Sequence, residues 1–194
     1  GLTLSLHMHV SLTVLGILLC LLGGFILSAI SAYFAGLVGS SSSPVSGAIL
    51  IMLLIASLIF AFVLKHLVDL SNPTILVHAA AYTILVTAVV ATMVTISNDT
   101  MQDMKSGQMV GSTPWKQQVV LIVGVIISAF ILPFIMQLLF DAYGLGDIFP
   151  HPNMNPANAL SAPQSTLVAA VAQGIFHNPL PWGSISLGGA IVAA

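Results

Sequence analysis

The chain has 194 residues, of which 58% are hydrophobic and 4% are charged, and its formal net charge is −2. A composition this poor in charge cannot give the mixed, charged surface of a soluble domain, so most of the chain must lie in lipid. Three basic residues against five acidic ones leave no basic patch for nucleic acid, which disfavours that class of partner. We therefore expect an all-α polytopic membrane protein.

The first two apolar runs are each long enough to cross a bilayer. We predict transmembrane helices over residues 10–37 and 45–64, separated by a break rich in Gly, Ser and Pro. Small residues recur every four positions along the first span, at Gly24, Ser28, Ala32 and Gly36. Such a stripe lets a second helix approach closely, and a substrate groove along it is the open alternative.

Two further spans are predicted over residues 75–96 and 119–140, and Pro133 is expected to kink the latter because proline removes a backbone hydrogen bond. A polar segment, residues 98–116, separates these two spans. Residues 141–162 are rich in Pro, Asn and Gly, which is typical of an irregular loop.

Two shorter apolar stretches end the chain. Residues 163–176 predict a helix of about 21 Å, which is too short for the ~30 Å of hydrocarbon, so we expect it to be re-entrant or interfacial. Residues 182–194 predict a truncated helix, and the chain begins at Gly1 without a methionine. We therefore expect a single transmembrane region with about four spanning helices, as part of a larger membrane protein.

The polar segment holds half of the charged residues of the chain. If the third span continues through it as a helix, Asn98, Gln102 and Lys105 fall on one face. Asp99 and Asp103 then fall one turn apart on another face. Two carboxylates one turn apart can share a proton or a cation, as a coupled transporter requires. A solvated loop with ordinary charges is the alternative, and both readings stay open.

The break after the first span and the end of the polar segment share a short pattern, in which Val-Gly-Ser is followed by Pro44 or by Pro114. We expect Ser43 and Thr113 to cap the helices that begin there, with proline in the first turn. The two breaks should face the same side of the membrane, and their free N–H groups would suit an anion such as a peptide carboxylate. Ordinary turn chemistry is the alternative. The candidate polar contacts in the first break are Ser40, Ser42 and Ser43.

His78, one turn before Tyr82 in the third span, is an ionisable group that could relay protons or cap the membrane interface. The sequence has no nucleophile triad, phosphate-binding loop or metal-binding His and Glu spacing. We therefore predict no enzyme site, no metal site and no bound cofactor.

Three blocks of sequence resemble the oligopeptide transporter (OPT) superfamily, and most closely its prokaryotic and yellow-stripe-like branch. The blocks are GFILSAISAYFAGLVGSSSSPVSG at residues 24–47, NDTMQDMKSGQMVGSTPWKQQ at residues 98–118, and residues 162–167 followed by 179–183. They occur in the family's order, and the second block is long and specific enough to identify the family by itself.

The resemblance implies secondary active, proton-coupled transport of small oligopeptides or metal chelates by a multi-pass protein of the prokaryotic inner membrane. Because family members are several times longer, this chain resembles a central to C-terminal portion. The expected partners are membrane lipid, the peptide or metal-chelate substrate, protons and the remaining helices of the transporter, with homo-oligomerisation left open.

Under this hypothesis Asp99 and Asp103 respond to protons or cations, and Gln102 and Lys105 contact the substrate. The alternative is a non-transporting scaffold or channel-like subunit, in which residues 98–116 form a loop that docks a partner.

Overall fold

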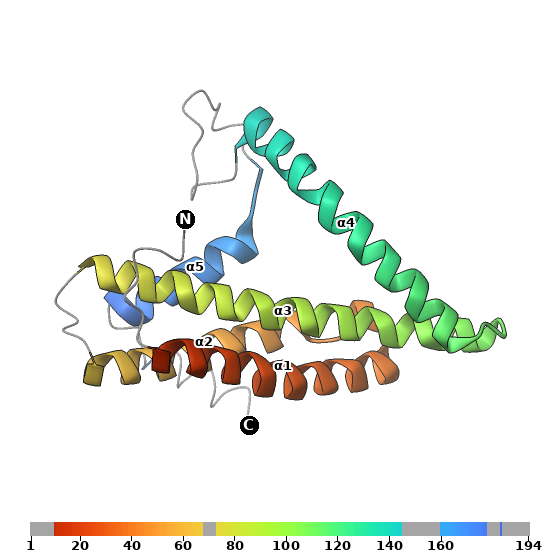
Figure 1. Ribbon diagram of the computed structural model, residues 1–194, viewed down its shortest axis with the longest axis horizontal. Helices are drawn as coiled ribbons and strands as arrows, with labels where there is room; N and C mark the ends of the chain where they lie inside the picture. Colours follow the sequence, from red (N-terminus) through yellow and green to blue (C-terminus); the bar gives the residue numbers. More distant parts are fainter. Residues whose placement is uncertain (1–9, 68–72, 145–159, 178–182, 184–194) are drawn as a thin grey trace. The chain divides into compact units, whose positions relative to one another are not determined.

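The computed structural model describes residues 10–67, 73–144, 160–177 and 183. The regular elements in these residues are helical (Figure 1): α1 (Val10–Val38), the 3-10 turn η1 (Ser40–Ser42), α2 (Val45–Leu67), α3 (Pro73–Met109), α4 (Pro114–Tyr143) and α5 (Pro163–His177). The predicted all-α fold class is confirmed. By length and composition α1 to α4 could each cross a membrane, whereas α5 is shorter.

Helix α3 differs most from the predicted spans, because it continues through the polar segment as far as Met109. Residues 98–109 contain no proline, and half of them are Met, Gln or Lys, which are good helix formers, so the helix can continue through them. The chain turns at Gly111, whose φ of 73° is a conformation that glycine adopts readily. The polar side chains of this segment are therefore carried on a helix rather than on a loop.

Helix α4 also extends beyond the predicted span at both ends, and Pro133 lies inside it. Residues 141–143 belong to this helix, where an irregular loop was predicted, because the helix is stopped only by Gly144 with its φ of 70°. Residues 145–159 of the predicted loop, and the predicted helix over 182–194 apart from Gly183, lie outside the described residues.

The described residues group into two compact units. The first unit contains α1 up to Leu27, α2 from Ser46, α3 up to Met93, and α5 from Val168. The second unit contains the rest of α1, the break that follows it, the remainder of α3, α4 and the first residues of α5.

The core of the first unit is built by α2, α3 and α5, where Leu53, Ala80 and Ala172 form one buried cluster. Buried hydroxyl groups in this unit bond within their own helices. The hydroxyl of Ser57 donates to the carbonyl of Leu53 at 2.6 Å, and that of Thr83 donates one turn back along α3 at 2.9 Å. Because each hydroxyl is bonded to a carbonyl of its own helix, it needs no partner from another helix. These residues can therefore pack in an apolar environment.

Small residues of α1 allow α3 to approach closely in the first unit. A Cβ atom added at Gly16 would meet the hydroxyl of Tyr82, and one added at Gly24 would meet the sulfur of Met93. The Tyr82 hydroxyl donates to a backbone carbonyl of α1 at 3.3 Å. The predicted packing stripe is therefore correct at Gly24, whereas a Cβ at Gly36 would have nothing within 4 Å.

We expect Gly16→Ala to lower the free energy of unfolding by about 1–3 kcal/mol, the usual cost of overpacking a well-filled contact. The added methyl group would collide with Tyr82, whose rigid ring is tilted against Phe60 with the centroids 5.1 Å apart. Thermal unfolding of the intact protein in detergent measures the effect. Gly36→Ala is the matched control, and an equal loss of stability in both variants would contradict this packing.

Candidate functional site

In the second unit, Asn98 joins α3 to α1 and to the break that follows α1. Its side-chain nitrogen donates to the backbone carbonyl of Ser40 at 3.3 Å, and its Oδ1 accepts the hydroxyl of Ser31 at 3.4 Å. Asn98 is only 3% exposed. A buried amide whose donor and acceptor are both engaged fixes the position of the groups it binds.

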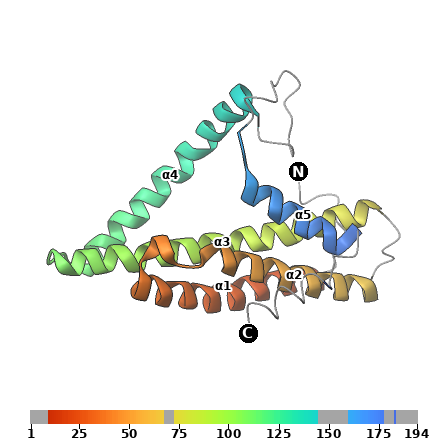
Figure 2. The same cartoon turned by 180° about the vertical axis from the view of Figure 1, so that it is seen from behind.

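Gln102, one turn later on α3, binds the same residue of the break. Its Oε1 accepts the backbone N–H of Ser40 at 3.0 Å. Asn98 and Gln102 together, here termed the amide clamp, therefore bind both backbone polar groups of Ser40. Figure 2 shows the break beside the green half of α3. A break between two apolar helices leaves backbone groups outside regular helical bonding. The clamp supplies the partner of the Ser40 N–H and a second donor to the Ser40 carbonyl, which also accepts the N–H of Ser43.

The clamp forms because α1 and α3 run parallel in the second unit with a nearly constant sequence offset. The hydroxyl of Ser97 donates to the carbonyl of Ser28 at 3.1 Å, across 69 positions of sequence, and Ser31 meets Asn98 across 67 positions. Because α2 runs back between α1 and α3, these two helices point in the same direction. The C-terminal end of α1 therefore lies beside the C-terminal half of α3. The predicted link between the Ser-rich break and the polar segment is thus present in the structure.

The first break differs from the expectation of free N–H groups for an anion. The N–H groups of Gly39, Ser42 and Ser43 donate to backbone carbonyls at 3.0 to 3.3 Å, and that of Ser40 is bound by the clamp. Gly39 has a φ of 84° and η1 follows it, so the chain turns tightly enough to satisfy its own donors. These four N–H groups are therefore not free to bind an anion.

Ser43 does not act as the predicted cap of the second span. Helix α2 begins at Val45, and the Ser43 hydroxyl donates to the carbonyl of Ser31 at 3.5 Å. The η1 turn directs this side chain back toward α1, away from the start of α2. Ser42 lies in η1 and is exposed.

The second break matches its prediction more closely. Thr113 is the N-cap of α4 and Pro114 lies in the first turn, although the Thr113 hydroxyl makes no capping hydrogen bond. Gly111 adopts a positive φ like Gly39 in the first break, so the glycine of the shared Val-Gly-Ser pattern has a similar φ in both breaks, although the hydrogen bonds around it differ. The N–H of Ser112 donates to the carbonyl of Gly107 at 2.8 Å and closes the α3–α4 hairpin.

The two carboxylates of α3 lie on a side of the helix that the clamp does not use, whereas Lys105 lies on the same face as Asn98 and Gln102. Asp99, Asp103 and Lys105 are all exposed in the second unit. The Lys105 ammonium donates to Oε1 of Gln108 at 3.0 Å. The helical register keeps Asp99 and Asp103 one turn apart, as the sequence predicted for a helical continuation of the third span.

His78 belongs to the first unit, whereas the other candidate residues belong to the second. It is half-buried and lines a small apolar cavity of about 40 Å³ with Phe60, Leu64 and Tyr82. Sequence reasoning did not identify Ser31 and Ser97, which connect α1 to α3 in the second unit. Nothing in the sequence around either serine marks it as a residue that contacts another helix.

Comparison with known proteins places the chain in a family. The model of the OPT oligopeptide transporter protein family matches residues 1–194. A protein of Haemophilus influenzae described as "Putative oligopeptide transporter" is 40% identical over 192 residues, which is 95% of this chain and 29% of that relative. The chain thus spans less than a third of the length of the curated relative it matches. No solved structure matches the chain. The chain, with its spanning helices and its clamped polar break, belongs to the OPT oligopeptide transporter family.

Proposed function

We propose that this chain is part of a transporter that moves small oligopeptides across the prokaryotic inner membrane. The family match over all 194 residues and the bacterial relative named as an oligopeptide transporter support this function. Further helices of the intact transporter complete the path, because the chain spans 29% of that relative. The same proposal includes metal chelates as an alternative class of substrate.

The observation that carries the proposal is the amide clamp. It holds a broken stretch of backbone against the polar half of α3, between helices that are otherwise apolar. Discontinuous helices and polar side chains inside apolar bundles are the elements from which transporters build their substrate sites. The first break, with Ser40 and Ser42, and the polar half of α3 would therefore face the substrate path.

Within this path Asp99 and Asp103 would bind the coupling proton, and Lys105 would attract an anionic group of the substrate. Gln102 offers its Nε2 group, which the clamp does not use. Asn98 would act indirectly, since both ends of its amide are engaged with α1 and the break. His78 would be a separate proton-binding group in the first unit.

Uptake into proteoliposomes that contain the intact protein tests the proposal. A labelled tripeptide and a labelled metal chelate are supplied separately, each with and without an inward proton gradient. We expect accumulation of at least one of them, driven by the gradient and absent from protein-free liposomes. No accumulation of either substrate class, with protein shown to be inserted and folded, would favour the scaffold or channel-like alternative.

A further inference from the structure

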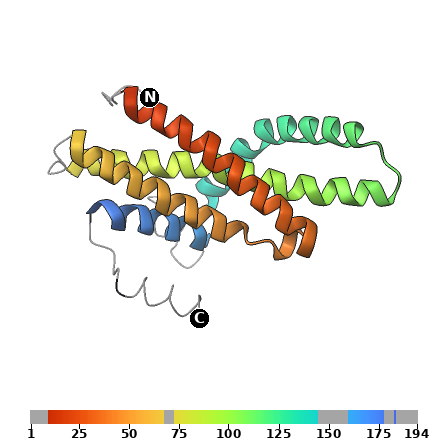
Figure 3. The ribbon, with the colours of Figure 1, turned by 90° about the horizontal axis from the view of Figure 1, so that it is seen from below.

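The second unit contains a helical hairpin in which α3 and α4 meet at a turn (Figure 3) and diverge away from it (Figure 1). The N–H of Ser112 donates to the carbonyl of Gly107, and Gly107 is buried. A Cβ atom at Gly107 would overlap the side chain of Gln117. Gly107 on α3 and Gln117 on α4 therefore lie at the same level below the turn.

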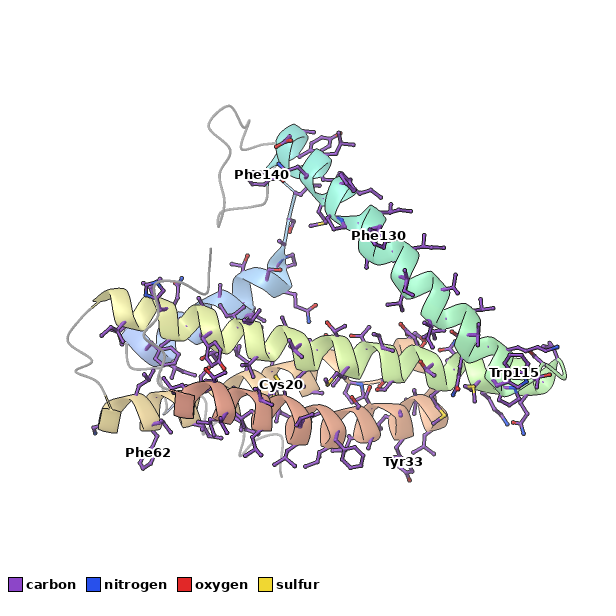
Figure 4. The ribbon with its side chains drawn as sticks, in the orientation of Figure 1. Cys20, Tyr33, Phe62, Trp115, Phe130 and Phe140 are labelled. Carbon is purple, nitrogen blue, oxygen red and sulfur yellow. The ribbon has the colours of Figure 1, made fainter. Side chains whose placement is uncertain are left out.

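The two arms differ in polarity. Between Lys116 and Asp141, α4 carries no charged residue, and none of its residues is buried. Large apolar side chains extend from it in several directions, including Phe130 at 72% exposed (Figure 4). A helix that is apolar all round needs lipid or protein around it rather than water. The facing part of α3 instead carries Asp99 and Asp103.

The level of the membrane surface follows from α4. Its polar residues extend from Pro114 to Gln118, or roughly 7 Å of helix, before the apolar run begins. On α3 the same length of about 7 Å, measured back from its last residue Met109, ends near Lys105. We therefore place the membrane surface near Lys105 on α3. A tilt of about 45° in either arm moves this level by only about two residues.

Trp115 gives the same level independently. It is 61% exposed near the tip of the hairpin, with the Lys116 ammonium 5.9 Å from its ring centroid. Tryptophan and lysine gather at the membrane–water interface, where an apolar body and a polar end are both satisfied. The segment of α3 from residue 98 to residue 104 then lies beneath that interface, down to about 10 Å below it.

We propose that residues 98–104 of α3 lie at the depth of the hydrocarbon and border a water-filled path, rather than projecting into bulk water. Charged side chains at this depth face protein or water, not lipid. Protein already covers Asn98, which is buried against α1 and the break. No described residue covers Asp99 and Asp103, and this uncovered side of α3 is the one assigned to the water-filled path. This placement does not depend on which substrate is transported.

Cysteine labelling of the intact protein in membrane vesicles tests the placement. Single cysteines are introduced into a background without native cysteine. Thr100→Cys lies on α3, Val110→Cys lies in the turn that follows, and Ile126→Cys lies on α4. Val110 lies at the hairpin tip and is 81% exposed. Ile126 is the apolar position for comparison, because it lies nine residues from Gln117 on α4 and Thr100 lies seven residues from Gly107 on α3.

We expect Val110→Cys to react with both a small charged methanethiosulfonate and a bulky polyethylene-glycol maleimide. Thr100→Cys should react only with the small reagent, and Ile126→Cys with neither. A full gel shift of Thr100→Cys with the bulky reagent would overturn the proposed depth. Failure of Thr100→Cys to react with either reagent would overturn the water-filled path. The labelling requires no transport, so its result is independent of the uptake assay. Gel filtration verifies that each variant is folded.

Discussion

Replacing Asn98 with alanine is expected to destabilise the second unit by about 2 kcal/mol, because a partly or fully buried polar group left without a partner costs about 1–3 kcal/mol. The substitution removes the acceptor for the buried Ser31 hydroxyl and one of two donors to the Ser40 carbonyl, which keeps the N–H of Ser43. Water in the membrane interior is scarce, so these groups have few replacement partners. Thermal unfolding of the intact protein in detergent measures the loss.

Two matched variants locate the effect in the clamp. Gln102→Ala removes one hydrogen bond from an exposed side chain and should cost less than Asn98→Ala. Thr92→Ala removes a hydroxyl that bonds only within α3, to the carbonyl of Ala88 at 2.9 Å, and should leave the unfolding temperature unchanged. If Asn98→Ala unfolds at the wild-type temperature, the clamp does not hold the break.

The double variant Asp99→Asn, Asp103→Asn is expected to take up substrate without dependence on the proton gradient. If one proton is coupled, a membrane potential of 100 mV supplies about 2.3 kcal/mol, or roughly fiftyfold accumulation, and this is lost with the coupling site. The asparagines keep the size and the helical positions of the carboxylates on α3. Uptake at several external pH values, with the gradient imposed or collapsed, measures the effect.

Asp141→Asn is the matched control for the carboxylate pair. Asp141 lies at the far end of α4, where its carboxylate accepts a hydrogen bond from Gln137 at 2.9 Å. This variant should keep its gradient-dependent uptake, and the two single variants at positions 99 and 103 show whether one carboxylate suffices. Gradient-driven accumulation that survives in the double variant would exclude Asp99 and Asp103 as the coupling site.

Local sequence was a good guide to the helices and a poor one to their ends. The predicted third span stopped where polar residues begin, whereas α3 continues to Met109 because helix propensity does not depend on polarity. Hydropathy marks where lipid can surround a helix, and backbone signals such as Gly111 mark where the helix ends. The two boundaries differ wherever a helix carries polar groups in an apolar protein.

The candidate site was predictable in part. Sequence placed the Ser-rich break and the polar segment on the same side, and the structure brings Ser40 onto Asn98 and Gln102. Sequence assigned Gln102 to the substrate and placed Asn98 on the same face of the helix, whereas Gln102 binds the break and Asn98 binds both the break and α1. Ser31 was not identified, since nothing in its neighbours distinguishes a serine that binds another helix from one that faces lipid.

The sequence by itself showed that lipid surrounds most of this protein, that its fold is helical, and to which family it belongs. Apolar runs of this length with so little charge leave the backbone no partners except its own helix. Only the tertiary structure decided which polar groups meet, because Ser31 and Asn98 are 67 positions apart and their contact depends on the register of α1 against α3. That register is set by side-chain packing between parallel helices, which no local pattern specifies.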